Sequence, residues 1–181
     1  MIIYSTRHGE TEWNSLDKIS GITEVELTPA GIEQAKLLAE RVCAECGDIS
    51  AIFCSPMKRA QITAGYTAKA LGLDIITDSR LREWNYGSFE GKHRDTEGYR
   101  EAKLQFGCKM PGGGESVFQL VGRIYPFLDD VREKYKGKNV LIVSHGGVCR
   151  IIDSYFSDMT SQRFSQFFMG NCELLRYVID Q

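Results

Sequence analysis

The sequence predicts an α/β fold, a three-layer α/β/α sandwich in which helices cover both faces of a mostly parallel central sheet. Short apolar, β-branched runs alternate along the chain with longer segments whose apolar residues recur at helical spacing. This alternation is typical of parallel strands joined by helices. Two of the runs, residues 2–6 and 139–144, each lead into His-Gly. Because the carboxyl ends of parallel strands share one edge of a sheet, we expect both histidines at a ligand-binding edge.

The composition is that of an ordinary globular protein, since 43% of the 181 residues are apolar and 25% are charged. The length fits a single domain over residues 1–181, or one domain with a small cap. A net charge of −2 argues against nucleic acid or an anionic membrane as the main partner. No apolar run reaches membrane-spanning length, and the first strand begins at Ile2 without a signal peptide, so we expect a cytoplasmic location.

The first predicted strand ends in Arg7, His8 and Gly9. A charged Arg-His pair is costly inside a sheet but useful at its edge, and Gly9 lets the backbone turn closely past a ligand. On position alone, Arg7 and His8 are more often ordinary surface residues than a ligand-binding pair. The later motifs decide between these two interpretations. Residues 12–26 are polar and show no period, which predicts a loop.

The next segment predicts a helix, a strand and a second helix. Thr28 is a good N-cap for a helix that ends at Gly47, and residues 49–54 form an apolar strand. Ser55-Pro56 then predicts a helix start, which places Arg59 in the first helical turn. A cation in the first turn opposes the helix dipole. The position of Arg59 therefore indicates that an anion binds between its side chain and the helix N-terminus.

Residues 73–77 predict a short strand, and the segment after it contains Glu83 among Trp84, Tyr86 and Phe89. Most glutamates are exposed carboxylates, but these aromatic neighbours could remove Glu83 from water. Loss of water raises the pKa of a carboxyl group, which makes Glu83 a candidate proton donor.

Residues 92–110 are polar, with some helical character from 96 to 106. Their basic side chains could bind an anionic part of a ligand, but we favour a solvated face. The residues concerned are His93, Arg94, Arg100 and Lys103. A glycine-rich turn at 111–116 then leads into a long amphipathic helix, in which Pro126 lies off the buried face and should bend the helix outward. The turn lacks the Lys-Ser/Thr of a nucleotide-binding loop.

The last third of the chain predicts a strand at 139–144, His145, and a helix that begins directly after it. This places His145 between a strand end and a helix N-terminus, a position that favours anions. Residues 159–168 predict a further helix, and 173–179 predict the last strand, which we place at the edge of the sheet.

The six cysteines do not suggest a disulfide framework or a metal site. Cys43 and Cys46 form a lone C-x-x-C without a second pair at zinc-ligand spacing, and both fall on the apolar side of a predicted helix. We therefore expect buried, unpaired thiols.

Several motifs together resemble the histidine phosphatase (phosphoglycerate mutase-like) superfamily, in the family's order and over nearly the whole chain. They are Arg7-His8-Gly9-Glu10-Thr11 with Trp13-Asn14, the S-P-x-x-R-A-x-x-T-A pattern at 55–64, the L-x-E-x-x-x-G-x-x-x-G pattern at 81–91, a P-x-G-E-S-like turn at 111–116, and Ser144-His145-Gly146-Gly147. The family's usual G-W-x-D is replaced by Gly21-Ile22-Thr23-Glu24, which departs from the pattern on the substrate side of the first loop. Among members of the family, the chain is most similar in size to the small phosphatases, such as the α-ribazole and broad-specificity phosphatases.

The resemblance implies a role for each matching residue. His8 would attack phosphorus and become a phosphohistidine, Arg7, Arg59 and His145 would hold the phosphoryl oxygens, and Glu83 would donate the proton. Asn14, Thr23 and Gly146 would contribute further phosphate or substrate contacts. The resemblance also implies that residues 92–110 cover the site and set its specificity.

The sequence thus predicts a phosphomonoester hydrolase that acts on small phosphorylated metabolites, as a monomer or homodimer, without a metal ion or cofactor. The short 92–110 segment favours hydrolysis over the alternative of a cofactor-dependent phosphoglycerate mutase, which is a longer protein. A second alternative is an inactive module that only binds a phosphorylated ligand. The presence of His8, Arg59, Glu83 and His145 together argues against that alternative.

Overall fold

The computed structural model describes residues 1–179. Its sheet has the strand order β3-β2-β4-β1-β5. The strands are β1 (Ile2–Arg7), β2 (Ile49–Cys54), β3 (Ile75–Thr77), β4 (Asn139–Ser144) and β5 (Leu174–Val178). The pairs β1-β4, β4-β2 and β2-β3 are parallel, and only the edge strand β5 runs antiparallel, against β1. This confirms the mostly parallel sheet and the edge position of the last strand.

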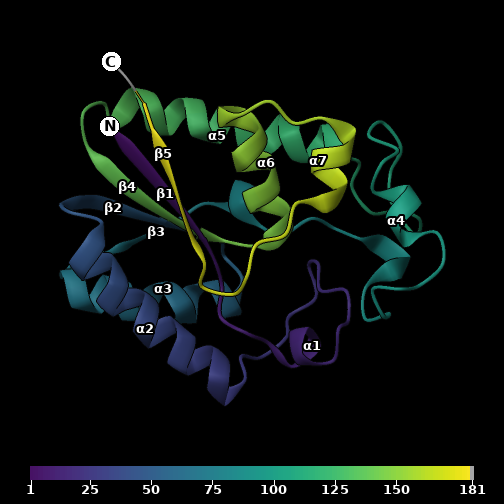
Figure 1. Cartoon of the computed structure of the whole chain (residues 1–181), viewed down its shortest axis with the longest axis horizontal. Helices are drawn as coiled ribbons and strands as arrows, with labels where there is room; N and C mark the ends of the chain where they lie inside the picture. Colours follow the sequence, from purple (N-terminus) through teal and green to yellow (C-terminus); the bar gives the residue numbers. More distant parts are fainter. Residues whose placement is uncertain (180–181) are drawn as a thin grey trace.

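The α-helices are α1 (Glu12–Ser15), α2 (Pro29–Glu45), α3 (Lys58–Leu71), α4 (Tyr99–Ala102), α5 (Val117–Lys134), α6 (Gly146–Phe156) and α7 (Ser161–Gln166). The long helices form a layer on each side of the sheet, whereas α1 and α4 lie outside these layers (Figure 1). Helices α2 and α3 lie on one face, and α5 and α6 lie on the other. The three-layer sandwich is therefore confirmed. Among the described residues, no helix is both long enough and apolar enough to cross a membrane.

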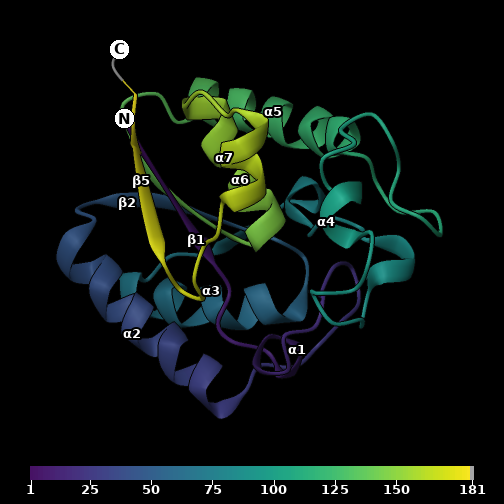
Figure 2. The ribbon, with the colours of Figure 1, turned by 45° about the vertical axis from the view of Figure 1, so that its right-hand side comes forward.

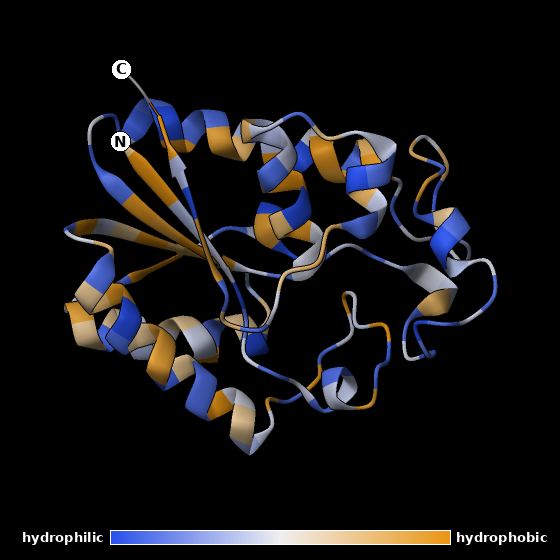
Figure 3. Cartoon of the chain, viewed as in Figure 1, coloured by the Kyte–Doolittle hydropathy of each residue, from blue (hydrophilic) through white to orange (hydrophobic). Residues whose placement is uncertain are grey.

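The two faces of β4 belong to two different cores. Val140 and Ile142 pack in the cluster under α5 and α6, whereas Leu141 and Val143 pack in the cluster under α2 and α3. This division follows from the alternation of side chains along a strand. Apolar stripes on the helices face the sheet, as the orange bands of Figure 3 show. Burial on both faces explains why these strands are continuous apolar runs.

Three local predictions need correction. Helix α3 begins at Lys58, because the Ser55 hydroxyl accepts a hydrogen bond from the Met57 N–H at 3.3 Å and also contacts His145. The loop at 12–26 contains the short helix α1, which a Thr11–Asn14 capping box stabilises. The expected helix at 96–106 is reduced to α4.

The cysteines are free thiols, but two of them are exposed, so the prediction of buried thiols is wrong for Cys43 and Cys108. Cys43 follows the buried Val42 directly, and one residue along a helix turns a side chain about 100° away from the buried stripe. Cys108 lies in the irregular part of the cap segment (residues 92–110). The exposed Pro126 lies inside α5, off its buried face as predicted.

The cap segment lies beyond the helical layers. Figure 2 shows α4 and its loops to the side of α5 and α6, far from the N-terminus marked at the other end of β1. The loop that carries α1 lies on the same side of the molecule (Figures 1 and 2). Both segments therefore lie toward the carboxyl end of β1, which is where the two histidine motifs follow their strands.

Candidate active site

Strands β1 and β4 bring the two histidines together, as the sequence predicts. Arg7 pairs with Ser144 in the parallel register, and the His8 N–H donates to the Ser144 carbonyl at 3.0 Å. The imidazole rings of His8 and His145 then meet edge to face, with centroids 5.1 Å apart. Both residues are buried.

The hydrogen bonds of His8 fix its tautomer. Nδ1 lies 2.7 Å from the Gly9 carbonyl oxygen, which only accepts, so Nδ1 carries the proton. Nε2 is left with its lone pair, to which Arg59 Nε donates at 3.2 Å. Burial, together with the positive charges of Arg59 and Arg7, holds the pKa of His8 well below 6.5. His8 is therefore neutral near pH 7, with an unprotonated nitrogen at Nε2.

Arg59 is held rigidly in the first turn of α3, where its exposed fraction is only 1%. Its Nη1 donates to the Thr23 carbonyl at 2.9 Å, and its Nη2 donates to the Gly21 carbonyl at 2.6 Å. The first loop therefore orients the guanidinium group toward His8. The second cation, Arg7, donates from Nη1 to the Met169 carbonyl at 2.9 Å, and its buried Nε has no partner.

Glu83 is 5% exposed, which confirms the expectation that the chain removes it from water. Oε1 accepts the Trp84 N–H at 2.7 Å, and Oε2 accepts the Gly147 N–H at 3.1 Å. Burial raises the pKa of Glu83 above 4.5, although the two N–H groups and the charges of Arg59 and Arg7 act in the opposite direction. A side chain at Gly147 would clash with this carboxyl group, because its Cβ would lie 2.5 Å from Oε1.

His145 is the N-cap residue of α6, at the strand-to-helix junction that the sequence indicates. Its Nε2 lies 2.7 Å from the Ser55 hydroxyl, while its buried Nδ1 has no partner. Burial, with the charges of Arg59, His8 and Arg7, holds the pKa of His145 well below 6.5. In the tautomer in which the Ser55 hydroxyl donates to Nε2, the ring proton lies on Nδ1, which is then a free donor.

Asn14 reaches the same region from α1. Its Oδ1 accepts the Thr11 N–H and an N–H of Asn171, each at 3.2 Å, and its buried Nδ2 has no partner. Asn171 also donates to the His8 carbonyl at 2.9 Å. Asn171 lies before β5 and belongs to none of the motifs, so the sequence gives no signal for this contact.

Thr23 lies beside Arg59, but it is exposed, it does not line the cavity beside His8, and its N–H donates to Glu90 Oε2 at 2.9 Å. Its role as a phosphate contact stays a prediction, whereas its carbonyl orients Arg59. Glu90 Oε1 also accepts the Ile22 N–H at 3.0 Å, so Glu90 ties the first loop to the segment after Glu83. Glu90 lies at a variable position of the 81–91 motif, so the pattern gave no signal for it.

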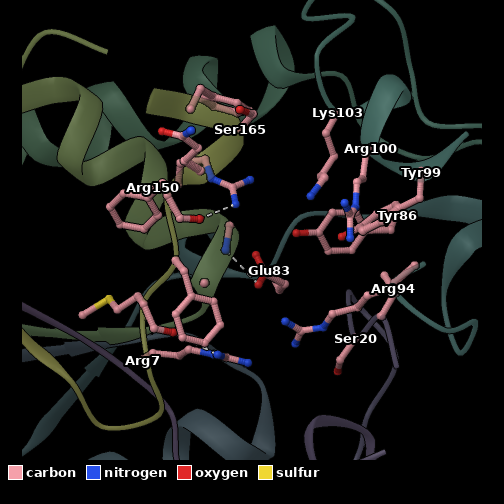
Figure 4. A pocket seen from close by; sticks show the side chains of 18 of the residues that line it. Arg7, Ser20, Glu83, Tyr86, Arg94, Tyr99, Arg100, Lys103, Arg150 and Ser165 are labelled. Atoms are coloured by element: carbon pink, nitrogen blue, oxygen red, sulfur yellow. Dashed lines mark hydrogen bonds between the residues drawn. The ribbon is translucent and has the colours of Figure 1, made fainter. Parts of the chain in front are cut away.

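A cavity of about 470 Å³ opens beside His8, Glu83 and Gly146 (Figure 4). Five cationic side chains line it, namely Arg7, Arg94, Arg100, Lys103 and Arg150. The preference for a solvated face is therefore wrong for the half-buried Arg94 and Lys103, because the fold turns the cap segment toward the cavity. Arg100 also lines the cavity, but its side chain is 74% exposed, as the prediction of a solvated residue requires. His93 remains exposed, between Asp17 and Asp95. Within residues 1–179, no group of three His, Cys, Asp or Glu side chains is arranged to hold a metal ion.

Comparisons with known proteins agree with this geometry. Residues 3–181 match the family model of the histidine phosphatase superfamily (branch 1). The chain is 40% identical over 156 residues to phosphoglycerate mutase-like protein 4 of Arabidopsis thaliana, covering 82% of this chain and 67% of that protein. It is 37% identical over 158 residues to a metal-independent phosphoserine phosphatase of the same plant, covering 83% and 66%. The chain thus spans about two thirds of the length of these relatives.

The fold is also similar to that of solved structures. One is a putative α-ribazole-5′-phosphate phosphatase from Escherichia coli, with a TM-score of 0.83, 27% identity, and coverage of 100% of this chain and 92% of that one. The family match spans all the motifs that meet at His8. The chain therefore belongs to branch 1 of the histidine phosphatase superfamily.

Proposed function

We propose that this phosphatase-family enzyme hydrolyses small phosphomonoesters through a phosphohistidine at His8. The observation that carries the proposal is the state of His8, whose neutral Nε2 lone pair lies beside a buried guanidinium group. A neutral, buried imidazole can attack phosphorus, and a fixed cation can stabilise the charge that develops on the phosphoryl oxygens.

Three buried nitrogen atoms near His8 support a site for a phosphoryl group. Arg7 Nε, Asn14 Nδ2 and His145 Nδ1 have no hydrogen-bond partner. Buried polar groups are almost always paired in folded proteins, so a cluster of exceptions calls for a functional explanation. The oxygens of a phosphoryl group would supply acceptors for all three, and each such contact is worth on the order of 2–4 kcal/mol in the transition state.

Glu83 would complete both steps. In the first step, the P–O bond to the leaving group breaks as His8 Nε2 bonds to phosphorus, and protonated Glu83 gives its proton to the leaving oxygen. In the second step, carboxylate Glu83 takes a proton from water as that water attacks phosphorus and releases His8. The products are the alcohol and inorganic phosphate. The raised pKa of Glu83 suits a group that must hold a proton before the first step.

The alternative is a mutase, which transfers the phosphoryl group to a second hydroxyl instead of water. The short cap segment favours hydrolysis, because a mutase must keep water away from its phosphohistidine. We therefore expect inorganic phosphate to be released from p-nitrophenyl phosphate in the presence of EDTA. Faster transfer to 3-phosphoglycerate than to water, assayed with 2,3-bisphosphoglycerate, would favour the mutase.

His8→Ala tests the nucleophile directly. We expect turnover to be lost while the circular dichroism spectrum and the denaturation midpoint stay close to wild type, because His8 follows a strand and leaves the two cores intact. Rapid quench of the wild type with phosphorus-labelled substrate should trap an acid-labile, base-stable phosphoenzyme that the variant lacks. Retained turnover in His8→Ala would refute the mechanism.

A further inference from the structure

The cavity carries more positive charge than one phosphate group requires. Besides the groups around His8, its lining includes Arg94, Arg100, Lys103 and Arg150, whereas Glu83 is its one lining carboxylate within residues 1–179. Figure 4 shows Lys103 and Arg100 reaching into the cavity from the cap segment and Arg150 reaching in from α6, on the opposite side. These four cations form the cationic wall discussed below.

We propose that the substrate carries a second anionic group, a carboxylate or a second phosphate, which the cationic wall binds through Lys103 and Arg150. The inference rests on the proposed function and names the class of substrate that the same site accepts. It separates phosphorylated acids and bisphosphates, which would be good substrates, from phosphorylated neutral alcohols, which would be poor ones.

The salt bridges of the four cations show which two are free to bind a second anionic group. Arg94 lies 3.3 Å from Asp17, and Arg100 lies 2.9 Å from Asp95, so a carboxylate already accompanies each. Lys103 and Arg150 have no carboxylate partner among the described residues. Their positive charges therefore remain available to a ligand.

The surroundings of these two cations explain how they remain unpaired. The Lys103 ammonium lies 4.4 Å from the centroid of the Tyr99 ring, a contact in which the ring face attracts the cation. Arg150 packs against the Phe164 and Phe167 rings and donates from Nη2 to the Phe167 carbonyl at 2.9 Å. Its buried Nε has no partner. Aromatic rings thus hold both cations without neutralising their charge.

Repulsion among the cations adds a second argument. Burial, with the positive charges of Arg150, Arg94 and Arg100, lowers the pKa of Lys103 to about 8. Like charges that face one cavity destabilise one another unless an anion lies between them. A second anionic group on the substrate would relieve this repulsion, whereas a hydroxyl group would not.

The cavity also has room for a short carbon skeleton between the two anionic groups of the substrate. Apolar side chains also line the cavity, namely Leu104, Phe164, Phe167 and Phe168. A volume of about 470 Å³ falls within the range of small-molecule sites. A small organic phosphate with a second anion therefore matches both the charge and the size of the cavity.

Three probes test the inference on the wild-type enzyme. Glycerol 1-phosphate and 3-phosphoglycerate share a three-carbon skeleton and differ in a hydroxymethyl or carboxylate end, while propane-1,3-diol bisphosphate carries a second phosphate. We expect kcat/KM to be at least about tenfold higher for one or both of the probes with a second anion than for glycerol 1-phosphate. The reason is that hydrogen bonds between charged groups are stronger than those between neutral groups. The comparison also shows whether the wall prefers a carboxylate or a phosphate. Equal kcat/KM for all three probes would overturn the inference.

Lys103→Gln locates the effect on the wall. We expect the variant to raise KM for the preferred anion-bearing probe about tenfold and to leave kcat/KM for glycerol 1-phosphate within about twofold. Lys103→Arg should restore most of the loss. The matched control is Lys109→Gln, an exposed lysine of the same segment that does not line the cavity. An equal loss with all probes would mean that Lys103 supports only the fold of the cap segment, contrary to the proposal.

Calorimetric binding keeps this inference separate from the proposed function. If no probe releases phosphate, hydrolysis is refuted, but tighter binding of 3-phosphoglycerate than of glycerol 1-phosphate, lost in Lys103→Gln, would still support a second-anion site. If the probes are hydrolysed but bind equally well, only the second-anion site is refuted.

Discussion

At the scale of single residues, burial shifts the two proposed catalytic groups in opposite directions. Burial disfavours the charged form of any group, so it lowers the pKa of His8 and raises the pKa of Glu83. As the pH falls through the pKa of His8, the nucleophile becomes protonated and the rate should fall. As the pH rises through the pKa of Glu83, the acid loses its proton and the rate should fall again. Both shifts widen the pH range in which neutral His8 and protonated Glu83 coexist.

Glu83→Gln tests the acid. An alkyl phosphate leaves as a basic alkoxide and needs a proton, whereas nitrophenolate is a weak base and hardly needs one. We expect the variant to slow phosphoenzyme formation about a hundredfold or more with glycerol 1-phosphate but less than tenfold with p-nitrophenyl phosphate. Single-turnover rapid quench is the measurement, because the proposed second role of Glu83, in the water step, would affect both substrates alike. The alkaline fall in rate with glycerol 1-phosphate should disappear in the variant. An equal slowing of both substrates would assign the proton to another group.

At the scale of elements, Glu90 ties the segment after Glu83 to the first loop, and that loop in turn orients Arg59. The Glu90 carboxylate accepts the N–H groups of Ile22 and Thr23 and the Thr23 hydroxyl. The carbonyls of Gly21 and Thr23 in the same loop in turn accept from the Arg59 guanidinium. A side chain at Gly21 would not fit, because its Cβ would lie 2.6 Å from the backbone carbonyl oxygen of Trp84 as well as 2.4 Å from Glu90 Oε1. Glu90 therefore fixes the loop whose carbonyls orient Arg59, and the variants below test whether this positioning matters for the proposed reaction.

Glu90→Ala should lower kcat/KM about tenfold with p-nitrophenyl phosphate and with glycerol 1-phosphate alike, since Arg59 acts on the phosphoryl oxygens and not on the leaving group. Glu90→Gln, which keeps one acceptor oxygen, should recover part of the loss. Steady-state kinetics with both substrates is the measurement, and exposed Glu97→Ala is the control. A loss that depended on the leaving group, as expected for Glu83, would contradict this role.

At the scale of the whole molecule, the cores and the site are separable. The clusters under α2-α3 and α5-α6 stabilise the layers, whereas the site residues follow the strand ends and come from loops and helix starts. A large-to-small change in the core should therefore reduce stability without changing the chemistry of the molecules that stay folded.

Ile142→Ala tests this separation at the centre of β4, where the side chain is fully buried. We expect a loss of about 2–5 kcal/mol in the free energy of unfolding, measured by urea denaturation. At temperatures where the variant remains folded, kcat for p-nitrophenyl phosphate should stay within about threefold of wild type. Val178→Ala, at an exposed position of β5, should cost less than about 0.5 kcal/mol. A variant that is stable but inactive would show that the core and the site are coupled.

The sequence by itself determined the layers, the mostly parallel sheet and the edge at which His8 and His145 meet. These features follow from local patterns: apolar runs of strand length, helical spacing, and the glycines after each histidine. Thr28 was recognised as an N-cap for the same reason, because a cap depends only on its own helix start. Helix α3 begins later than the Ser55-Pro56 pattern predicts, because Ser55 contacts His145, 90 residues away in the sequence.

Only the tertiary structure decided what surrounds those histidines. The tautomer of His8, the contact of Asn171 with its carbonyl, and the link from Glu90 to the first loop all join segments that only the fold brings together. The inward direction of Lys103 depends on how an irregular cap segment crosses the cavity, which no period in the sequence encodes. Local patterns fix elements because their forces act between neighbours along the chain. Charge, burial and pairing at a site are set by the approach of distant side chains, which exists only once the chain has folded.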